Sequence, residues 1–179
     1  LKEYLQALDE INVDAIICAS PAVIDVARNH TNLEIHVSTQ QSITNSKAID
    51  FWYKRDVKRV VLAREVSLDE LSILKQNTKA DLEVFIHGGM CVSYSGKCTL
   101  SNSMTDRDAN RGGCAHSCRW NYDLIENEEK INEDTPFSMA SKDLQSVRYI
   151  SKLIDLGVDS LKIEGRMKSI HYIATVVKT

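Results

Sequence analysis

The sequence has no long hydrophobic run, no excess of positive charge and no initiating methionine. No stretch approaches the ~18 to 20 apolar residues that a membrane span needs, and no basic segment followed by an apolar one opens the chain. We therefore expect a soluble, cytoplasmic protein without a membrane partner. The net charge of -3 supplies no general attraction to nucleic acid, so a local basic patch would have to bind any RNA.

The length and the two ends bear on how complete the chain is. With 179 residues, 43% of them hydrophobic, residues 1–179 are expected to form a single domain with its own core. Apolar residues fall at helical spacing from Leu1 to Ile11 and again from Ile170 to Val177. Because a helical pattern begins at once and no initiating methionine precedes it, we expect a fragment of a longer protein.

Short apolar runs alternate with helical patterns along the chain. Five of these runs predict buried strands, at residues 14–19, 33–38, 57–63, 81–87 and 160–163. Helices are predicted between them, and Ser67 with Glu70 forms a capping-box pattern at the start of one. Ser42 or Thr44 is expected to cap another helix, which would carry Phe51 and its apolar neighbours toward the core.

This alternation predicts an α/β fold with a parallel sheet, because parallel neighbours need a crossover and a helix is the usual one. Polar residues stand at the carboxyl ends of the predicted strands, where a (β/α) barrel places its site: Ser20, residues 38–40, Arg64, Glu65, His87, Glu164 and Arg166. We therefore favour a partial TIM-like (β/α) barrel of about five parallel strands over a doubly wound sheet. Such a sheet would keep open edges, which favour a homo-oligomer.

Residues 88–141 interrupt this rhythm and contain four of the five cysteines, namely Cys91, Cys98, Cys114 and Cys118. Structureless loops beyond roughly 12 to 15 residues are uncommon unless functional, so cross-links are expected to hold this cysteine-rich insertion together. A metal is favoured over disulfides because the chain shows no secretory signal. Spacings of six, fifteen and three residues match neither common zinc ribbons nor a standard ferredoxin. Zinc and a [4Fe–4S] cluster both remain candidates, since four thiolates can hold either.

Two histidines and the fifth cysteine lie near this pattern. His87 and His116 are reserve metal ligands, although a solvent-facing loop position is the more usual one for a residue such as His116. Cys18 falls within a predicted strand, which indicates a buried core thiol.

One motif of the chain is long and specific. It runs from Glu83 through His87-Gly88-Gly89-Met90-Cys91 to Gly96, Cys98 and Leu100-Ser101. Shorter pieces accompany it at residues 36–40, 110–114, 118–120, 141–144 and 162–169. Together these motifs resemble peptidase family U32, the collagenase-like peptidases, over nearly the whole chain.

The resemblance implies a TIM-like barrel with further strands before Leu1 and often another domain after Thr179. It also implies an enzyme, because similar proteins hydroxylate RNA, including the wobble uridine of tRNA with prephenate as a required metabolite. Others hydroxylate the ubiquinone ring without molecular oxygen, and several hold a [4Fe–4S] cluster on cysteines. Some members were described as collagenases, so a U32-type peptidase is one alternative. A zinc-stabilised binding module without chemistry is another.

The family motifs suggest the metal ligands by position. Cys91, Cys98 and Cys114 match the recurring cysteines of the family. Many relatives have a further cysteine directly after the Lys-Asp-Leu motif, where this chain has Gln145, so Cys118 takes the role of fourth ligand by default. If Cys118 is not a ligand, three thiolates would share the site with water, a histidine or substrate.

Candidate catalytic residues are the polar groups near strand ends: Glu65, Glu83, His87 and Arg166. Glu65 and Glu83 could instead orient a neighbouring arginine. His87 with Cys91 is the one conceivable Cys–His pair for a peptidase, but a metal on Cys91 would consume its thiolate. No His-Glu-x-x-His pattern is present, so hydrolysis is the weaker hypothesis.

Basic residues around the cysteines are candidates for binding a tRNA backbone or a small anionic metabolite: Arg107, Arg111, Arg119, Lys162 and Lys168. Arg166 would join them at the same mouth. The alternative is that Asp106, Asp108 and Glu164 pair with some of these cations and hold the insertion in shape.

Overall fold

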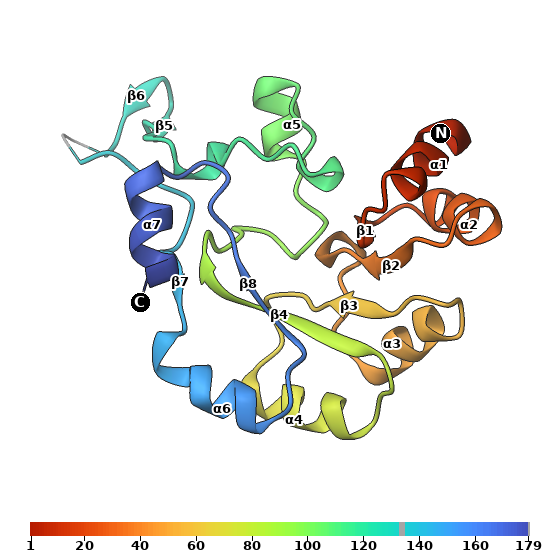
Figure 1. Ribbon diagram of the computed structural model, residues 1–179. Coiled ribbons are helices and arrows are strands. Elements are labelled where there is room, and N and C mark those ends of the chain that lie inside the picture. The colour runs from red at the N-terminus through yellow and green to blue at the C-terminus, as the bar shows by residue number, and fades with distance from the viewer. Residues whose placement is uncertain (133–134, 179) are drawn as a thin grey trace.

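In the part of the chain that the structure describes, residues 1–132 and 135–178, five parallel strands form a sheet that curls into part of a barrel (Figure 1). The structure is a computed structural model. Its strands follow the order β1 (Ala15–Cys18), β2 (Glu34–Val37), β3 (Arg59–Val61), β4 (Asp81–Gly88) and β8 (Ser160–Ile163). Each neighbouring pair in this order is parallel. The predicted α/β class and partial barrel are confirmed.

The connecting helices lie on the outer side of the curled sheet (Figure 1). They are α1 (Lys2–Glu10), α2 (Pro21–His30), α3 (Ser46–Tyr53), α4 (Leu68–Gln76), α6 (Ile150–Asp155) and α7 (Ile170–Lys178). None of the helices in the described residues has the length and hydropathy that a membrane-spanning helix requires.

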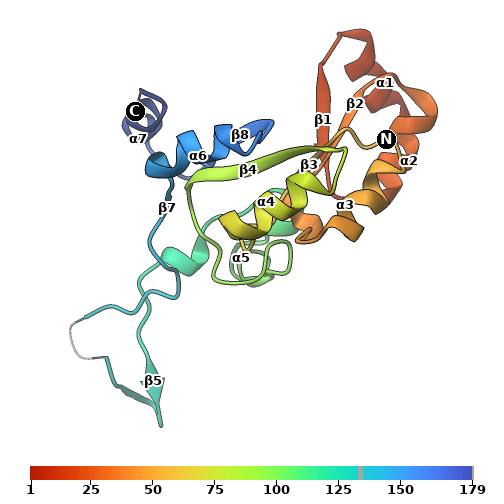
Figure 2. The ribbon, with the colours of Figure 1, turned by 90° about the horizontal axis from the view of Figure 1, so that it is seen from below.

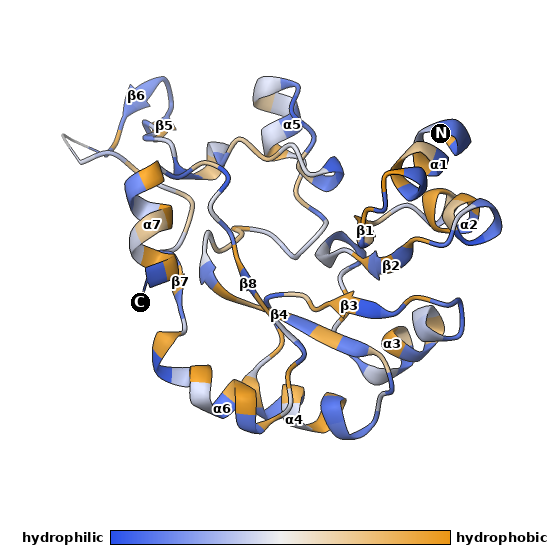
Figure 3. Ribbon diagram, viewed as in Figure 1, coloured by the Kyte–Doolittle hydropathy of each residue, from blue (hydrophilic) through white to orange (hydrophobic). Residues whose placement is uncertain are grey.

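One face of the sheet packs against these helices. Val37, Val60 and Leu82 are fully buried there in one cluster with Ile49 of α3 and Leu74 of α4. Hydropathy alternates over the first half of β4, residues 81–84 (Figure 3), because successive side chains of a strand point to opposite faces. Burying an aliphatic side chain of this size contributes about 1.5–3 kcal/mol, so this layer holds the sheet to its helices.

The opposite, concave face carries charged side chains. Lys162 Nζ lies 2.7 Å from Glu83 Oε1, and Arg59 Nη1 lies 3.9 Å from Glu83 Oε2. Glu83 is only 5% exposed, and a carboxylate so deeply buried requires cationic partners. Because the three residues come from β3, β4 and β8, this ion-pair group links three neighbouring strands.

Of the two helix starts predicted from local sequence signals, one is confirmed and one is wrong. The Ser67 hydroxyl accepts the Glu70 N–H at 3.3 Å, and the Glu70 carboxylate accepts the Ser67 N–H at 2.8 Å, so the predicted capping box is confirmed. The predicted cap of α3 is wrong, because the side chain of Asn45 caps this helix by accepting the Ala48 N–H at 3.0 Å. Ser42 instead adopts a left-handed backbone conformation one turn earlier.

The prediction that Phe51 points toward the core is also wrong. It is 47% exposed, and the guanidinium of Arg55 lies 3.6 Å above the centre of its ring. Trp52 takes the buried position next to it, where the two rings meet edge to face. This cation–π interaction partly offsets the free-energy cost of exposing the Phe51 ring to water.

The insertion contains short elements that no periodicity predicted. Helix α5 (Leu100–Thr105) comes first, followed by a hairpin of β5 (Ile125–Glu126) and β6 (Glu129–Lys130) that projects from the body (Figure 2). Just after the insertion, strand β7 (Leu144–Gln145) pairs antiparallel with the end of β4. Two-residue strands are too short to leave a periodic signal, which explains why they were missed.

An ion pair between Asp159 and Lys75 connects β4 to α4, and its pH dependence can be used to test how the sheet is held to this helix. The Asp159 carboxylate accepts the Leu82 N–H at 2.8 Å and pairs with Lys75 of α4. Burial would raise the pKa of Asp159, but the bonds from Lys75 and Leu82 hold it below its ordinary value. We predict that Asp159→Asn lowers the free energy of unfolding at pH 7 by about 1–2 kcal/mol, because the amide cannot keep the charge pair.

The sign of the pH dependence follows from the lowered pKa. Such a group stabilises the folded state above its ordinary pKa of about 3.9, and the contribution is lost as pH falls through the folded value. Denaturant unfolding of both proteins at pH 7 and below about pH 3 should show the difference vanish in acid. Asp14→Asn, at an exposed position, is the control. An equal loss in that variant, or a loss that persists in acid, would contradict the assignment.

Candidate functional site

A cavity of about 750 Å³ lies at the carboxyl ends of the strands, between the sheet and the insertion. On the strand side it is lined by Cys18, Arg64, Phe85 and Lys162, and on the other side by all four cysteines of the insertion. Its size falls within the range of small-molecule sites, and the carboxyl ends of the strands are where (β/α) barrels place their chemistry. We call it the thiol cavity.

Ser95 and Gly96 anchor the segment between Cys91 and Cys98 to the loops that follow β2 and β3. The Glu65 carboxylate accepts both the N–H of Ser95 at 2.8 Å and its hydroxyl at 3.0 Å. Gly96 has a φ of +78°, and a Cβ there would lie 2.0 Å from the carbonyl oxygen of Gln40. Only glycine fits so close a backbone approach, which explains its place in this segment.

The segment that carries Cys114 and Cys118 is held by two other hydrogen bonds. Ser101 Oγ, at the start of α5, accepts the Ala115 N–H at 2.9 Å. The Tyr122 hydroxyl donates to the carbonyl oxygen of Ser117 at 2.7 Å. Both segments of the insertion are therefore held by side chains that hydrogen-bond to their backbone, without any disulfide, since all five cysteines are free.

The four thiols are close enough to affect one another. Burial raises the pKa of Cys91, Arg64 lowers it, and the charges of Cys114 and Cys98 raise it again. Burial likewise raises the pKa of Cys118, with the other three thiols adding to the effect. Arg64 Nη1 lies 3.8 Å from the Cys91 sulfur. A bound cation would relieve this mutual effect, because it favours the ionised form of each thiol.

The donor chemistry suits a soft metal, but the set is not preformed. Within residues 1–132 and 135–178, no three Cys, His, Asp or Glu side chains lie close enough together to hold a metal ion. Zinc and iron–sulfur centres both take four thiolates, and the insertion offers four around one cavity. The residues therefore fit such a centre if the two cysteine segments move closer together.

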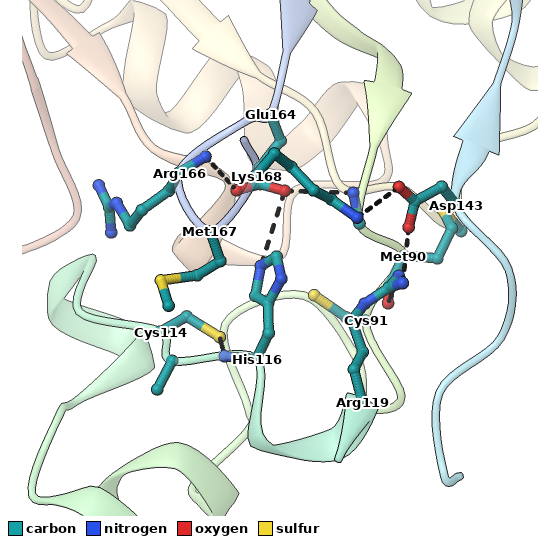
Figure 4. A network of polar contacts seen from close by, with 12 residues as sticks. Met90, Cys91, Cys114, His116, Arg119, Asp143, Glu164, Arg166, Met167 and Lys168 are labelled. Atoms are coloured by element: carbon teal, nitrogen blue, oxygen red, sulfur yellow. Dashed lines mark hydrogen bonds and ion pairs between the residues drawn. The ribbon is translucent and has the colours of Figure 1, made fainter. Parts of the chain in front are cut away.

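A polar network crosses the back of the thiol cavity (Figure 4). Glu164, just after β8, accepts the Gly89 N–H at 3.2 Å, and its carboxylate lies 3.6 Å from His116 Nε2. Burial lowers the pKa of His116, while the charge of Glu164 opposes that effect. His116 is thus a half-buried residue of the cavity wall, in contrast to the expected solvent-facing loop histidine.

Asp143 is the centre of a second part of this network. Its carboxylate lies 2.6 Å from Arg119 Nη1 and 2.6 Å from Lys168 Nζ, and it accepts the Tyr172 hydroxyl at 2.9 Å. Burial would raise the pKa of Asp143, but these partners together lower it. Burial and the bond to Asp143 raise the pKa of Tyr172 to about 12.

Of the four predicted catalytic residues, only Arg166 lines the thiol cavity. Glu83 is buried in its ion pair with Lys162, and the Glu65 carboxylate holds Ser95. His87 lines a second cavity of about 540 Å³, where its ring packs against Tyr172. His87 and Cys91 therefore face different cavities, and the conceivable Cys–His pair is not formed.

Of the five predicted substrate-binding residues, Arg111, Arg119 and Lys162 line the thiol cavity, whereas Arg107 and Lys168 do not. The expected acidic partners are not the ones observed. Asp143 pairs with both Arg119 and Lys168. The carboxylates of two of the expected partners serve the backbone instead: Asp108 accepts the Asn110 N–H, and Glu164 accepts the Arg166 N–H.

Sequence reasoning missed three residues of the site. Arg64 was noted only as a strand-end residue, yet it stacks 3.6 Å from the centre of the Phe85 ring beside Cys91. Asp143 lies in the Lys-Asp-Leu motif, which was the available signal. Cys18 packs against the core as expected but also lines the thiol cavity, and burial raises its pKa to about 11.

Comparison with known proteins extends these findings. The chain is 52% identical over 184 residues to tRNA hydroxylation protein P1 of Bacillus subtilis, which covers 99% of this chain and 44% of that protein. It is 36% identical over 169 residues to the 23S rRNA 5-hydroxycytidine C2501 synthase of Escherichia coli, covering 94% of this chain and 26% of the synthase. A collagenase of Porphyromonas gingivalis is 34% identical over 191 residues, covering 99% and 46%. The chain thus spans less than half the length of these relatives.

The fold and the site together define a protein of the partial (β/α) barrel class with a thiol-lined cavity at the carboxyl ends of its strands. A solved structure, that of the U32 peptidase Mk0906, shares the fold with a TM-score of 0.50 at 11% identity, over 90% of this chain and 60% of the other. The sequence profile of peptidase family U32 matches residues 1–179. The chain belongs to this family, as its motifs indicated.

The close approach at Gly96 gives a test of how the thiol cavity is built. We predict that Gly96→Ala destabilises the protein by about 3 kcal/mol or more, the sum of left-handed strain and an added backbone clash. The segment between Cys91 and Cys98 should then detach from the loops at Gln40 and Glu65 and become sensitive to limited proteolysis. Denaturant unfolding and mapping of the cleavage sites by mass spectrometry check this.

Gly157→Ala is the matched control, because Gly157 has a similar φ of +73° but a Cβ there would meet only the end of the Lys75 side chain, at 3.6 Å. Gly157→Ala should lower the free energy of unfolding only by the left-handed backbone strain, about 1–2 kcal/mol, and leave the insertion intact. Equal effects of the two substitutions would rule out the clash with Gln40 as the cause.

Proposed function

We propose that this chain belongs to an iron–sulfur-dependent RNA hydroxylase that acts on tRNA, at the wobble uridine, with prephenate as a required metabolite. The observation that carries the proposal is the meeting of four thiols in one cavity at the carboxyl ends of the strands. Two similar proteins are named for hydroxylation of tRNA and of 23S rRNA, which supports RNA as the substrate. Because the chain spans 44% of the Bacillus subtilis relative, the activity of the whole protein is part of the proposal.

The four cysteines Cys91, Cys98, Cys114 and Cys118 would hold a [4Fe–4S] cluster. Gln145, at the position where the family resemblance led us to expect a cysteine, lines the second cavity, which favours Cys118 as the fourth ligand. A bound cluster would supply electrons or bind an oxygen donor, whereas the protein supplies orientation and charge. Zinc is the alternative metal, since four thiolates suit it equally.

Three arginines are assigned to anion binding. Arg64, Arg111 and Arg166 line the thiol cavity and form no ion pair with a carboxylate of the described residues. Arg119 and Lys162, in contrast, are already paired with Asp143 and Glu83. An unpaired guanidinium can bind a carboxylate or phosphate with two parallel hydrogen bonds. We assign these three to the carboxylates of a metabolite such as prephenate and to the phosphates of RNA.

Two other functions are weaker. Peptidase activity is supported by the resemblance to a collagenase, but His87 and Cys91 line different cavities and provide no nucleophile–base pair. A zinc-stabilised binding module without chemistry is compatible with the thiols, and metal analysis separates it from the hydroxylase.

Self-association through open sheet edges also remains a proposal. Strand β1 pairs only with β2, and β8 pairs only with β4, so each leaves one edge unpaired within the described residues. Such edges are ready to pair with another chain, and light scattering would report the resulting oligomer.

The metal proposal predicts the composition of the purified protein. Anaerobically purified protein should contain iron and sulfide and absorb light at roughly 400 nm, as thiolate-bound clusters do. Replacing any one of Cys91, Cys98 or Cys114 with serine should remove most of the iron, because a cluster needs its thiolates. Cys18→Ser is the matched control and should keep its iron. A colourless protein with one zinc would refute the iron–sulfur assignment, and loss of iron in the control would make Cys18 a ligand.

The substrate proposal predicts a change in cellular tRNA. Deletion of the gene should leave the wobble uridine one oxygen atom lighter in nucleoside mass spectrometry, and a strain unable to make prephenate should show the same loss. The wild-type gene should restore the oxygen, whereas the Cys98→Ser gene should not. Unchanged nucleosides in tRNA and rRNA of the deletion strain would exclude RNA as the substrate.

A further inference from the structure

The thiols of the insertion lie on two separate segments, and one arginine contacts both. Arg119 directly follows Cys118, and its Nη2 donates to the carbonyl oxygen of Met90, directly before Cys91, at 3.5 Å. Its Nη1 lies 2.6 Å from Asp143 Oδ1 (Figure 4). The guanidinium therefore connects the Cys91 segment, the Cys118 segment and Asp143.

Asp143 is a fixed point in this arrangement. It directly precedes β7, which pairs with the end of β4 at Gly88. Its other oxygen binds Lys168 at 2.6 Å and the Tyr172 hydroxyl of α7 at 2.9 Å. The Arg119 and Asp143 side chains are only 21% and 22% exposed, so solvent screens their ion pair less than a surface pair. The sheet and α7 thus hold the carboxylate to which Arg119 is attached.

The contacts of Arg119 leave room for the segments to move closer. Its bond to Met90 is long, and Asp143 Oδ1 has no well-aligned hydrogen-bond partner in the described residues despite its short distance to Nη1. The thiols do not form a preformed metal site in the described residues, so binding requires the thiols of the insertion to move closer together. A movement that shortens the Arg119–Met90 contact brings the two cysteine segments together.

We propose that Arg119 and Asp143 are a positioning pair that brings Cys91 and Cys118 to a common metal. Arg119 acts through its fork, which reaches Met90 and Asp143 at the same time. Lysine carries the same charge as a single point and cannot span both partners. This inference rests on the proposed function only in that the thiols must bind a metal; it does not depend on the substrate.

The test uses Co²⁺ added to the reduced, metal-free protein under anaerobic conditions. Thiolate-to-cobalt charge-transfer absorption reports how many thiolates bind, and competition with a chelator gives the affinity. Arg119→Lys should weaken binding about 10-fold or more, the usual effect of losing a group that orients a metal ligand. It should also reduce the charge-transfer intensity, which a general loss of stability would not do in the fully bound state.

Asp143→Asn is a second, isosteric variant and should have the same effect. Because both residues act as one pair, the double variant should bind no more weakly than the weaker single variant. Arg148→Lys is the matched control, since Arg148 is exposed outside the thiol cavity, and it should bind as the wild type does. Circular dichroism before titration confirms that each variant is folded.

The outcomes separate this inference from the proposed function. If the wild-type protein binds neither Co²⁺ nor Zn²⁺ through thiolates, the metal site and the positioning pair are both excluded. If the wild type binds but Arg119→Lys and Asp143→Asn match it in affinity and absorption, the positioning pair is excluded and the metal site remains. Weaker binding in both variants with normal binding in Arg148→Lys would establish the pair.

Discussion

The close backbone contact between Gly88 and Glu164 is the constraint on which the arrangement of the site depends. Gly88 has a φ of +120°, and a Cβ there would lie 2.3 Å from the Glu164 carbonyl oxygen, while the Glu164 N–H donates to His87 at 2.9 Å. Any side chain would push β4 and β8 apart at this point. Because the two strands touch here, the insertion that leaves β4 starts beside the loop that leaves β8. Glu164 can therefore bind Gly89.

The basic residues of the same region fall into two groups, those paired with carboxylates and those that are not. Two carboxylates, the buried Glu83 and the partly buried Asp143, neutralise cations that sequence reasoning had assigned to substrate, namely Lys162, Arg119 and Lys168. Desolvation makes such pairs costly to break, so these cations are held in place rather than available to a ligand. Arg64, Arg111 and Arg166 line the thiol cavity without a carboxylate partner among residues 1–132 and 135–178, which is why the proposed anion site rests on them.

The fold was largely predictable, because strand and helix patterns are local. Periodicity located the five parallel strands, and the Ser67–Glu70 spacing gave the correct helix start. The failures concern features that the local pattern does not decide. Asn45 and Ser42 both suit a helix start, and only the backbone path decides which of them caps α3. The strands β5 and β6 of the insertion and β7 just after it are two residues long and pair through contacts that no sequence period records.

The sequence by itself determined the alternation of strands and helices, the glycines at close contacts, and the gathering of four thiols in one insertion. Only the tertiary structure decided which residues share a cavity. His87 and Cys91 are four residues apart yet face different cavities, because β4 ends between them. Cys18 and Arg64 are far apart in sequence yet line the same one, because parallel strands bring their carboxyl ends to one edge of the sheet.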